Sequence, residues 1–307
     1  MRGLGMILRE NAPATKPELW ASLPRAVGRR LFVQLRGLLD REWWTRPYVT
    51  TLAPYTDALI EVIPAEKRGL ALIYYGIIEY APTRLVNAYL KPGDTFIDVG
   101  ANIGYYSMIA GRAVGREGHV VAFEPFDRVR ASLERSVKLN GFTHVEVRSE
   151  VVDRASGIID LFEVTDRTNE GLSSTVVPPD HSTRVSHQCV SLDEVVARRG
   201  EAARVDFLKV DVEGGEDAVF AGARALLERD VAPSILFESF VPQRDHATLR
   251  SFGYRIYEPR LDATGKLRLH PVNAGTVPRP YRRWEAPNYF AVKSPRGDAF
   301  VRALCPP

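Results

Sequence analysis

The feature that most constrains this fold is a glycine-containing loop between a predicted strand and a predicted helix. The run Thr95 to Val99 is short, apolar and rich in β-branched residues, which predicts a strand. The loop that follows contains the pattern D-x-G-x-x-x-G over residues 98–104, and residues 102–114 are predicted to form a helix. Glycine lets the backbone turn tightly and approach a ligand closely. We therefore expect a ligand-binding strand–loop–helix unit.

The alternation of strands and helices continues along the chain. Because alternating strands and helices are typical of βαβ units, they predict a parallel sheet with helices on its faces. Further strands are expected at 119–123, from His144 to Val147, and at 205–212, 234–240, 253–258 and 288–293. Helices are expected at 127–140 and 214–229 and near 191–199 and 243–252, and residues 165–187 are expected to form an irregular loop.

An acid at the end of the second strand indicates which ligand the loop binds. Glu124 follows the strand 119–123, where a carboxylate can accept hydrogen bonds from ribose hydroxyls. Phosphate-binding motifs fit less well, because no lysine follows Gly104 and residue 102 is asparagine rather than glycine. Asp98 would repel a phosphate, but it would favour a cationic ligand such as the α-ammonium group of S-adenosylmethionine (SAM). The alternative is a strand–turn–helix corner that needs its glycines for packing alone.

A second polar group lies at the end of the predicted strand 205–212. Side chains alternate along a strand, so Lys209, Asp211 and Glu213 share one face. Either carboxylate could take a proton from an acceptor hydroxyl, the two together could hold a divalent metal, and the lysine could stabilise developing negative charge. The alternative is a structural Lys–Asp ion pair followed by acids at a helix N-terminus.

Four sequence blocks resemble the FkbM family of SAM-dependent methyltransferases. They are FIDVGANIGYYSMIAG (96–111), VVAFEPFDRVRASLERSVKLNG (120–141), GLSST (171–175) and FLKVDVEGGEDAVFAGA (207–223). The resemblance covers roughly residues 79–240, and APNYFAVK (286–293) shows a weaker similarity. It implies the class I methyltransferase fold, a Rossmann-like α/β architecture with a seven-stranded, mostly parallel sheet. Its last strand, expected at 288–293, is antiparallel.

The resemblance also implies which residues contact the cofactor, SAM. The glycine loop would line the methionine and ribose side, through Asp98, Gly100, Ala101, Asn102 and Gly104. After the second strand, Glu124 would hold the ribose hydroxyls, with Pro125 beside it. Glu150 and Asp153, after the third strand, would lie near adenine, and Asp211 would also lie near the cofactor. We expect Asp211 to be the catalytic base, with Glu213 and Lys209 as further catalytic candidates; no metal ligands are assigned.

Other candidates lie outside the cofactor loop. Ser173 and Ser174 in the long polar loop could bond the acceptor or cofactor, or could form a local turn. His181 in the same loop is a weaker candidate for a general base. The basic amphipathic stretch 25–39 could lie on an anionic membrane surface, although packing on its own domain or on a dimer partner is the more common role of such a helix.

Composition sets the outer limits of the prediction. The formal net charge of +3 gives no strong basic field, so we do not expect a nucleic-acid substrate. Two cysteines exclude a disulfide framework, and no apolar run reaches the length of about 20 residues that a membrane-spanning helix needs. We expect a cytoplasmic enzyme, with a homodimer possible. It would have a mainly helical extension at 1–88 that forms an acceptor pocket or an oligomer contact, a SAM-binding domain at 89–294 and a tail at 295–307.

These observations predict a SAM-dependent O-methyltransferase. The resemblance implies a hydroxylated small-molecule acceptor such as a sugar, a glycoside or a polyketide-like natural product. Two alternatives stay open at this point: an NAD-dependent oxidoreductase, which would share the ribose-binding acid, and a SAM-binding protein without catalytic activity.

Overall fold

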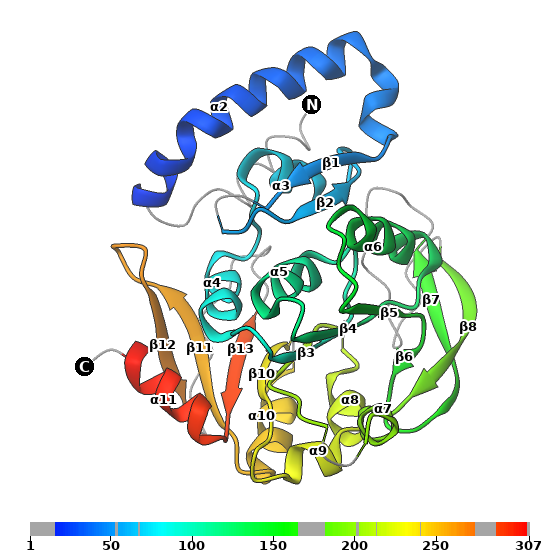
Figure 1. The fold of residues 1–307 in the computed structure, drawn as a ribbon, viewed down its shortest axis with the longest axis vertical. Coiled ribbons are helices and arrows are strands. Elements are labelled where there is room, and N and C mark those ends of the chain that lie inside the picture. The colour runs from blue at the N-terminus through cyan, green and yellow to red at the C-terminus, as the bar shows by residue number, and fades with distance from the viewer. Residues whose placement is uncertain are drawn as a thin grey trace.

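A central eight-stranded sheet organises the molecule. The computed structural model describes residues 16–305 apart from 53–54, 67, 165–181, 201–202, 213, 240 and 274–286. The strand order in the sheet is β12-β11-β13-β10-β9-β3-β4-β5 (Figure 1). The bounds of these strands, in that order, are Leu267–Val272, Arg255–Leu261, Asn288–Val292, Ser234–Glu238, Phe207–Val210, Thr95–Val99, His119–Phe123 and Val145–Arg148.

The sheet is mostly parallel, as the sequence predicted. Strands β5, β4, β3, β9 and β10 run parallel to one another. The expected last strand is present as β13, which pairs antiparallel with β10 on one side and with β11 on the other. An eighth strand, β12, which the sequence analysis did not assign, pairs antiparallel with β11 at the edge. The predicted seven-stranded arrangement is therefore extended by one strand.

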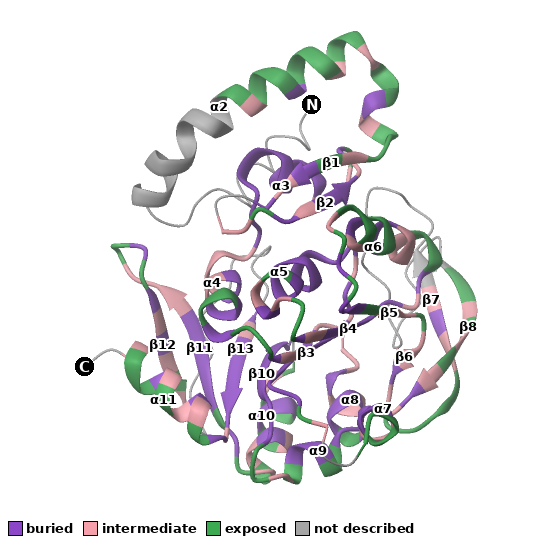
Figure 2. Cartoon of the chain, viewed as in Figure 1, coloured by how far each residue is buried: buried purple, intermediate pink, exposed green. Residues whose placement is uncertain are grey.

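Helices cover both faces of the sheet, so its central strands are buried on both sides (Figures 1 and 2). One face packs with α4, α5 and α6 in a single apolar core, and the other packs with α7, α8, α9 and α10 in a second core. Their bounds are Tyr80–Tyr89, Tyr105–Val114 and Asp127–Leu139 on the first face, and Leu192–Arg198, Glu216–Ala221, Arg224–Glu228 and Pro242–Ser251 on the second.

Two predicted elements differ in the structure. The helix expected at 214–229 is divided into α8 and α9, because a Cβ at Gly222 would overlap the backbone oxygen of Asp153 and the chain turns at this close contact. The loop expected at 165–187 is partly wrong, since β8 (Ser182–Val190) pairs along its length with β7 (Gly157–Val164) and its last two residues with β6 (Val151–Val152). Most side chains of β8 are polar, so it lacks the apolar run that marked the other strands in the sequence.

The N-terminal extension contains a β-hairpin among its helices, which the sequence analysis did not assign. It contains α2 (Lys16–Leu39), the short 3₁₀ helix η1 (Arg41–Thr45), a hairpin of β1 (Tyr48–Thr51) with β2 (Leu59–Val62), and α3 (Gly69–Tyr75). The hairpin docks on α6, where the amide of Leu59 donates to Asn140 Oδ1 at 2.8 Å and the amide of Glu61 donates to Ser136 Oγ at 2.9 Å. Buried side chains of the extension belong to the same apolar core as α5.

The C-terminal residues also form an element that the sequence analysis left unassigned. Helix α11 (Pro295–Leu304) begins with Ser294, whose Oγ accepts a hydrogen bond from the amide of Gly297. Arg296 in its first turn reaches both carboxylate oxygens of Asp94 at 2.6–2.8 Å and Oδ1 of Asp206 at 3.2 Å. These bonds fasten the helix to the amino-terminal ends of β3 and β9.

Candidate functional site

The carboxyl ends of β3 and β9 bring two charged side chains together. Asp98 and Lys209 are direct partners in the β3–β9 register. Two residues earlier on the same face, the rings of Phe96 and Phe207 stack with centroids 5.5 Å apart. Because side chains alternate along each strand, the two pairs lie on the same face of the sheet. The apolar pair lies in the core, and the charged pair lies at the carboxyl edge of the sheet, where ligands of open α/β sheets bind.

Lys209 bridges two carboxylates at this edge. Its Nζ lies 3.1 Å from Asp211 Oδ2 and 3.7 Å from Asp98 Oδ1. Asp98 is fully buried, and its Oδ2 accepts a hydrogen bond from Ser107 Oγ at 2.6 Å, whereas its Oδ1 has no hydrogen-bond donor among the described residues. The Lys–Asp ion pair expected as the structural alternative is therefore present, and it leaves one buried carboxylate oxygen without a donor.

The pKa values of Asp98 and Asp211 are shifted in opposite directions. Burial raises the pKa of Asp98, and the charge of Lys209 offsets this only in part. Burial also acts to raise the pKa of Asp211, but the charges of Lys209 and Arg68 outweigh it, so this pKa lies below its usual range. Burial disfavours the Lys209 ammonium, yet Asp211, Asp98 and Glu79 together raise its pKa. Asp211 and Lys209 are thus held in their charged forms.

Two residues that the sequence analysis did not select complete this corner. The Tyr106 ring lies under Lys209, with its centroid 5.1 Å from Nζ, and its hydroxyl donates to Glu79 Oε2 at 2.6 Å. Glu79 precedes α4 in a left-handed backbone conformation with φ of 52°, which is uncommon for a residue other than glycine. No spacing in the sequence connects Glu79 with Lys209, because only the packing of α4 against α5 brings them together.

The glycine loop uses all of its own amides. Gly100 and Ala101 both donate to the Phe123 oxygen, at 3.1 and 2.9 Å, and Asn102 donates to Glu124 Oε2 at 2.8 Å. The amide of residue 103 donates to the Asn102 side chain, and Gly104 donates to the Ala101 oxygen. A pyrophosphate site needs amides that point at the ligand. This loop offers none at residues 100–104, as expected from the absence of a phosphate-binding motif.

Backbone conformation explains the glycine at position 100. Its φ is +77°, and a Cβ there would overlap the backbone oxygen of Asp211. The loop is therefore pressed against the end of β9, which brings Gly100 and Asp211 side by side. Asn102 also adopts a positive φ, of 53°, which asparagine tolerates better than most residues.

Glu124 occupies the position expected for a ribose acid. It is buried, and its two oxygens accept hydrogen bonds from the amides of Asn102 and Phe126 at 2.8 and 3.0 Å. Burial raises the pKa of Glu124 to about 7, although these two amides favour the ionised form. Each carboxylate oxygen retains a second lone pair that a ligand hydroxyl could use. The neighbouring Pro125 contributes its backbone oxygen to Arg130 at 2.9 Å.

The other predicted residues lie outside the glycine loop. Glu150 forms an ion pair with Arg148, whose backbone oxygen accepts a hydrogen bond from the Glu124 amide. The Asp153 amide donates to the Val190 oxygen, and its backbone oxygen lies against Gly222. Glu213, Ser173, Ser174 and His181 lie outside the described residues.

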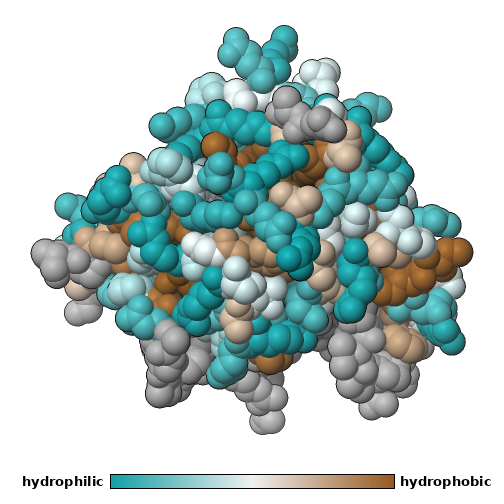
Figure 3. Space-filling view, turned by 90° about the horizontal axis from the view of Figure 1, so that it is seen from below, coloured by the Kyte–Doolittle hydropathy of each residue, from teal (hydrophilic) through white to brown (hydrophobic). Residues whose placement is uncertain are grey.

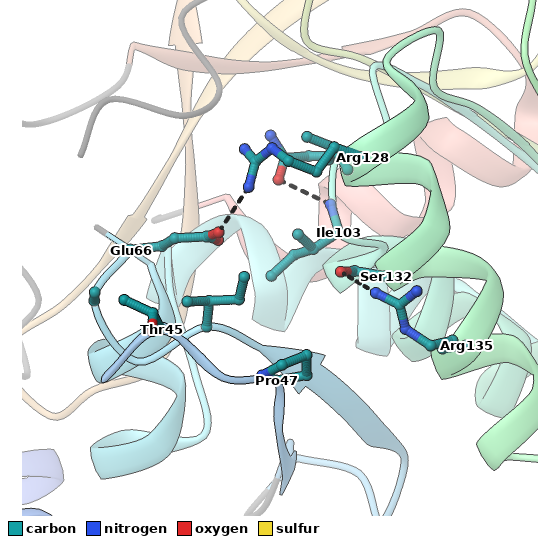
Figure 4. A pocket seen from close by; sticks show the side chains of 11 residues that line it. Thr45, Pro47, Glu66, Ile103, Arg128, Ser132 and Arg135 are labelled. Atoms are coloured by element: carbon teal, nitrogen blue, oxygen red, sulfur yellow. Dashed lines mark hydrogen bonds and ion pairs between the residues drawn. The ribbon is translucent and has the colours of Figure 1, made fainter. Parts of the chain in front are cut away.

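A pocket of about 300 Å³ lies between the extension and the SAM-binding domain predicted from the sequence (Figure 4). It touches the glycine loop at Asn102 and Ile103, but Asp98, Glu124, Lys209 and Asp211 do not line it. Glu66 and Arg128 form an ion pair across it at 3.3 Å. Its wall combines apolar and hydrogen-bonding side chains from both parts of the chain, including Thr45, Pro47, Ile63, Val129, Ser132 and Arg135.

The edge as a whole carries an excess of acidic side chains. Asp98 and Glu124 are buried and Asp211 is partly buried, whereas the buried base there is Lys209, which contacts Asp98 and Asp211. The pKa of both Asp98 and Glu124 is raised. A cationic ligand would relieve this excess, whereas a phosphate would increase it. Among the residues that the structure places, no group of three or more His, Cys, Asp or Glu side chains is arranged to hold a metal ion.

Comparison with known proteins identifies related sequences and folds. Residues 98–256, just over half of the chain, match the family model described as the methyltransferase FkbM domain. A protein-L-isoaspartate O-methyltransferase of Methanococcus aeolicus is 31% identical over 58 residues. That match spans 19% of this chain and about a quarter (27%) of the curated relative.

Two solved structures are similar at low sequence identity. A FkbM methyltransferase from Methylobacillus flagellatus is 16% identical, with a TM-score of 0.40 over 73% of this chain and 54% of that one. A SAM-dependent O-methyltransferase from Thermotoga maritima is 14% identical, with a TM-score of 0.41 over 80% of this chain and 77% of that one.

Proposed function

The chain belongs to the FkbM methyltransferase family and is a SAM-dependent methyltransferase, and from this premise we propose that it methylates a hydroxyl oxygen of a small-molecule acceptor. The acceptor class that we propose is a sugar, a glycoside or a polyketide-like natural product. The observation that carries the proposal is Asp211, an ionised carboxylate that Lys209 holds at the edge of the sheet beside the glycine loop.

The acidic edge fits a cationic cofactor. We propose that Glu124 accepts hydrogen bonds from the ribose hydroxyls, and that the loop from Gly100 to Gly104 forms the surface beside the methionine part. Asp98 is buried, so it would act through its charge and through its bond to Ser107, which supports the loop from below. Glu150 and Asp153 would serve the adenine side, as expected from the sequence.

Asp211 is the proposed proton acceptor. Bound SAM supplies an activated methyl group on a positively charged sulfur. The low pKa of Asp211 makes it a weak base but keeps it ionised, so it is always available to accept a hydrogen bond from the hydroxyl. It would take the proton once the oxygen has begun to bond to carbon, when that proton becomes strongly acidic. Lys209 and Tyr106 keep the carboxylate in place.

We propose that the pocket beside Asn102 holds the part of the acceptor that does not react, and that the reacting hydroxyl extends out of the pocket to Asp211, which does not line it. The pocket's volume lies at the lower end of the range of ligand pockets, and its mixed lining suits a molecule with several hydroxyl groups. Five of the eleven residues in its wall come from residues 45–66, so the extension would help to determine which acceptor binds.

An oxidoreductase is disfavoured by the same loop. NAD carries a pyrophosphate, and the five amides of residues 100–104 are already bonded within the protein. A SAM-binding protein without catalytic activity remains the contrasting outcome of the experiment.

The experiment is a SAM-dependent screen of sugar and natural-product acceptors, with and without chelator. With an acceptor in hand, Asp211→Asn should lower kcat by about 10²–10⁴-fold while SAM binding changes little. Asp230→Asn, at an exposed acid between α9 and β10, is the matched control and should retain full activity. Binding of SAM without methylation of any acceptor would favour the inactive alternative.

A second pair of variants tests the pocket. Ala65 is exposed and lines it, so Ala65→Trp should raise the acceptor KM at least tenfold and leave SAM affinity unchanged. Ala225→Trp places the same side chain on the exposed side of α9 and should alter neither the acceptor KM nor the SAM affinity. Loss of SAM binding in Ala65→Trp would instead assign the pocket to the cofactor.

A further inference from the structure

Helix α2 has a leucine stripe that no other described part of the chain covers. Leu31, Leu35, Leu38 and Leu39 are 58%, 50%, 80% and 84% exposed. Residues 31, 35 and 38 recur at intervals of four and three, so they lie on one face of the helix. Helix α2 forms one border of the molecule, and the described part of its surface is mostly exposed (Figure 2).

The opposite face of α2 holds the helix on the protein. Arg29 Nη1 donates to the Ile73 oxygen at 3.1 Å, Val33 is buried, and a Cβ at Gly37 would overlap the Trp44 ring. Packing therefore uses residues 29, 33 and 37, and the leucines point away from it. Of the two more common roles expected for such a stripe, packing on its own domain does not apply to Leu31, Leu35 and Leu38, which leaves a dimer partner or a membrane surface to cover them.

The charge of α2 differs from that of the rest of the chain. The segment Lys16–Leu39 contains five basic residues and one acidic residue, a net charge of +4, against +3 for all 307 residues. The rest of the chain is therefore slightly acidic. Arg30 and Arg36 on the helix, and Arg41 just after it, are exposed. Basic residues beside an exposed apolar stripe are typical of helices that lie in the interface of an anionic membrane.

A second copy of the chain suits this surface less well. Pairing two such helices through their leucines would bring Arg30 and Arg36 of each copy close together, and α2 has one acidic residue to offset five basic ones. A standard protein interface also uses about 20–30 residues a side, far more than this stripe. In the part of the chain that the structure describes, no helix combines the length and hydropathy needed to cross a bilayer.

We propose that α2 is a peripheral membrane anchor. It would lie parallel to an anionic lipid surface, with Leu31, Leu35, Leu38 and Leu39 inserted among the acyl chains. Arg36 and Arg41 would contact the acidic headgroups, whereas the Arg30 guanidinium lies 5.9 Å from the centroid of the Tyr74 ring and would add to the positive charge beside the lipid. The anchor would bring residues 45–66, which form the pocket wall next in the chain, toward the lipid.

The test is co-sedimentation of the full chain with phosphatidylcholine vesicles, with and without phosphatidylglycerol. Wild type should bind the anionic vesicles at least tenfold more tightly, and added salt should weaken binding. The double variant Leu35→Asp with Leu38→Asp should lose binding, whereas Val231→Asp, at an exposed valine between α9 and β10, should retain it. Arg36→Glu should reduce binding about fivefold or more, and Arg116→Glu, at an exposed arginine between α5 and β4, should not.

Three results would overturn the proposal. The first is a wild-type chain that does not bind anionic vesicles, and the second is binding that the double leucine variant leaves intact. The third is a wild-type dimer in sedimentation velocity that the double variant converts to a monomer, which would assign the stripe to a second copy. The melting temperature of the double variant should equal that of wild type, because both leucines are exposed.

Discussion

The carboxyl edge of the sheet and the outer face of α2 depart from the usual distribution of side chains in opposite ways. At the edge, Asp98, Lys209 and Glu124 are charged or titratable and buried. On α2, four leucines are exposed. By contrast, the surface seen from the side opposite α2 is mostly hydrophilic, with a few separate apolar patches (Figure 3).

The two departures have different physical causes. Buried charges are costly unless they are paired, so the edge is stable only through a network of partners contributed by β3, β9, α4 and α5. Exposed leucines cost the folded chain little, because they are exposed in the unfolded chain as well. A change at the buried residues Asp98, Glu124 or Lys209 should therefore alter stability and cofactor binding together, whereas a change on the stripe should alter neither.

The largest expected effect comes from removing the central cation of the edge. Lys209→Met leaves the buried Asp98 without its ammonium partner and leaves Asp211 with the charge of Arg68 alone, which should lower the free energy of unfolding by about 3–5 kcal/mol at pH 8. Urea denaturation measures this loss, and Lys138→Met on the exposed side of α6 is the control. The loss should shrink when Asp211→Asn is added. An equal effect in both lysine variants would mean that the edge network contributes no stability.

A pH-dependent effect should follow from Glu124. Its pKa rises from the usual 4.5 to about 7 in the folded protein, so the folded state keeps a proton that the unfolded chain releases between these values. The free energy of unfolding should therefore fall as pH rises from 4.5 to 7, by on the order of 3 kcal/mol. In Glu124→Gln this contribution is absent.

Denaturation of both proteins at pH 4.5 and at pH 8 measures the difference. The variant should gain stability relative to wild type at the higher pH, because it has no carboxylate to ionise. A constant difference between the two proteins across this range would contradict the burial assigned to Glu124.

The smallest effects should separate the two faces of α2. Val33→Ala removes buried methyl groups from the packed face and should cost about 1–3 kcal/mol. Leu38→Ala on the exposed face should change the free energy of unfolding by less than about 0.5 kcal/mol. Thermal denaturation of the two variants compares them directly, and a larger loss in Leu38→Ala would mean that the stripe is covered in solution.

Local sequence patterns predicted most of the sheet but not its margins. Strands such as Thr95–Val99 and Ser234–Glu238 are apolar because both faces of the sheet are covered, so composition alone reveals them. Strands β7 and β8 lie in a small side sheet with polar positions, and the hairpin β1–β2 is surrounded by prolines. Their conformation depends on partners that are distant in the sequence.

The candidate site also contains residues that the sequence could identify and residues that it could not. Asp98, Gly100, Glu124 and Asp211 could be selected because each lies at or just after the carboxyl end of a predicted strand. Glu79 and Tyr106 could not, because they act through the packing of α4 against α5. Sequence also could not show that Asp98 is fully buried, which changes its role from surface contact to buried charge.

The most direct test of the account is the affinity for SAM of wild type and of the edge variants, measured by isothermal titration calorimetry. Wild type should bind SAM and not NAD, Asp98→Ala and Glu124→Ala should each abolish SAM binding, and Asp230→Asn should bind as wild type does. Tight binding of NAD, or unchanged SAM affinity in both edge variants, would contradict the claim that the acidic edge of the sheet holds the cofactor.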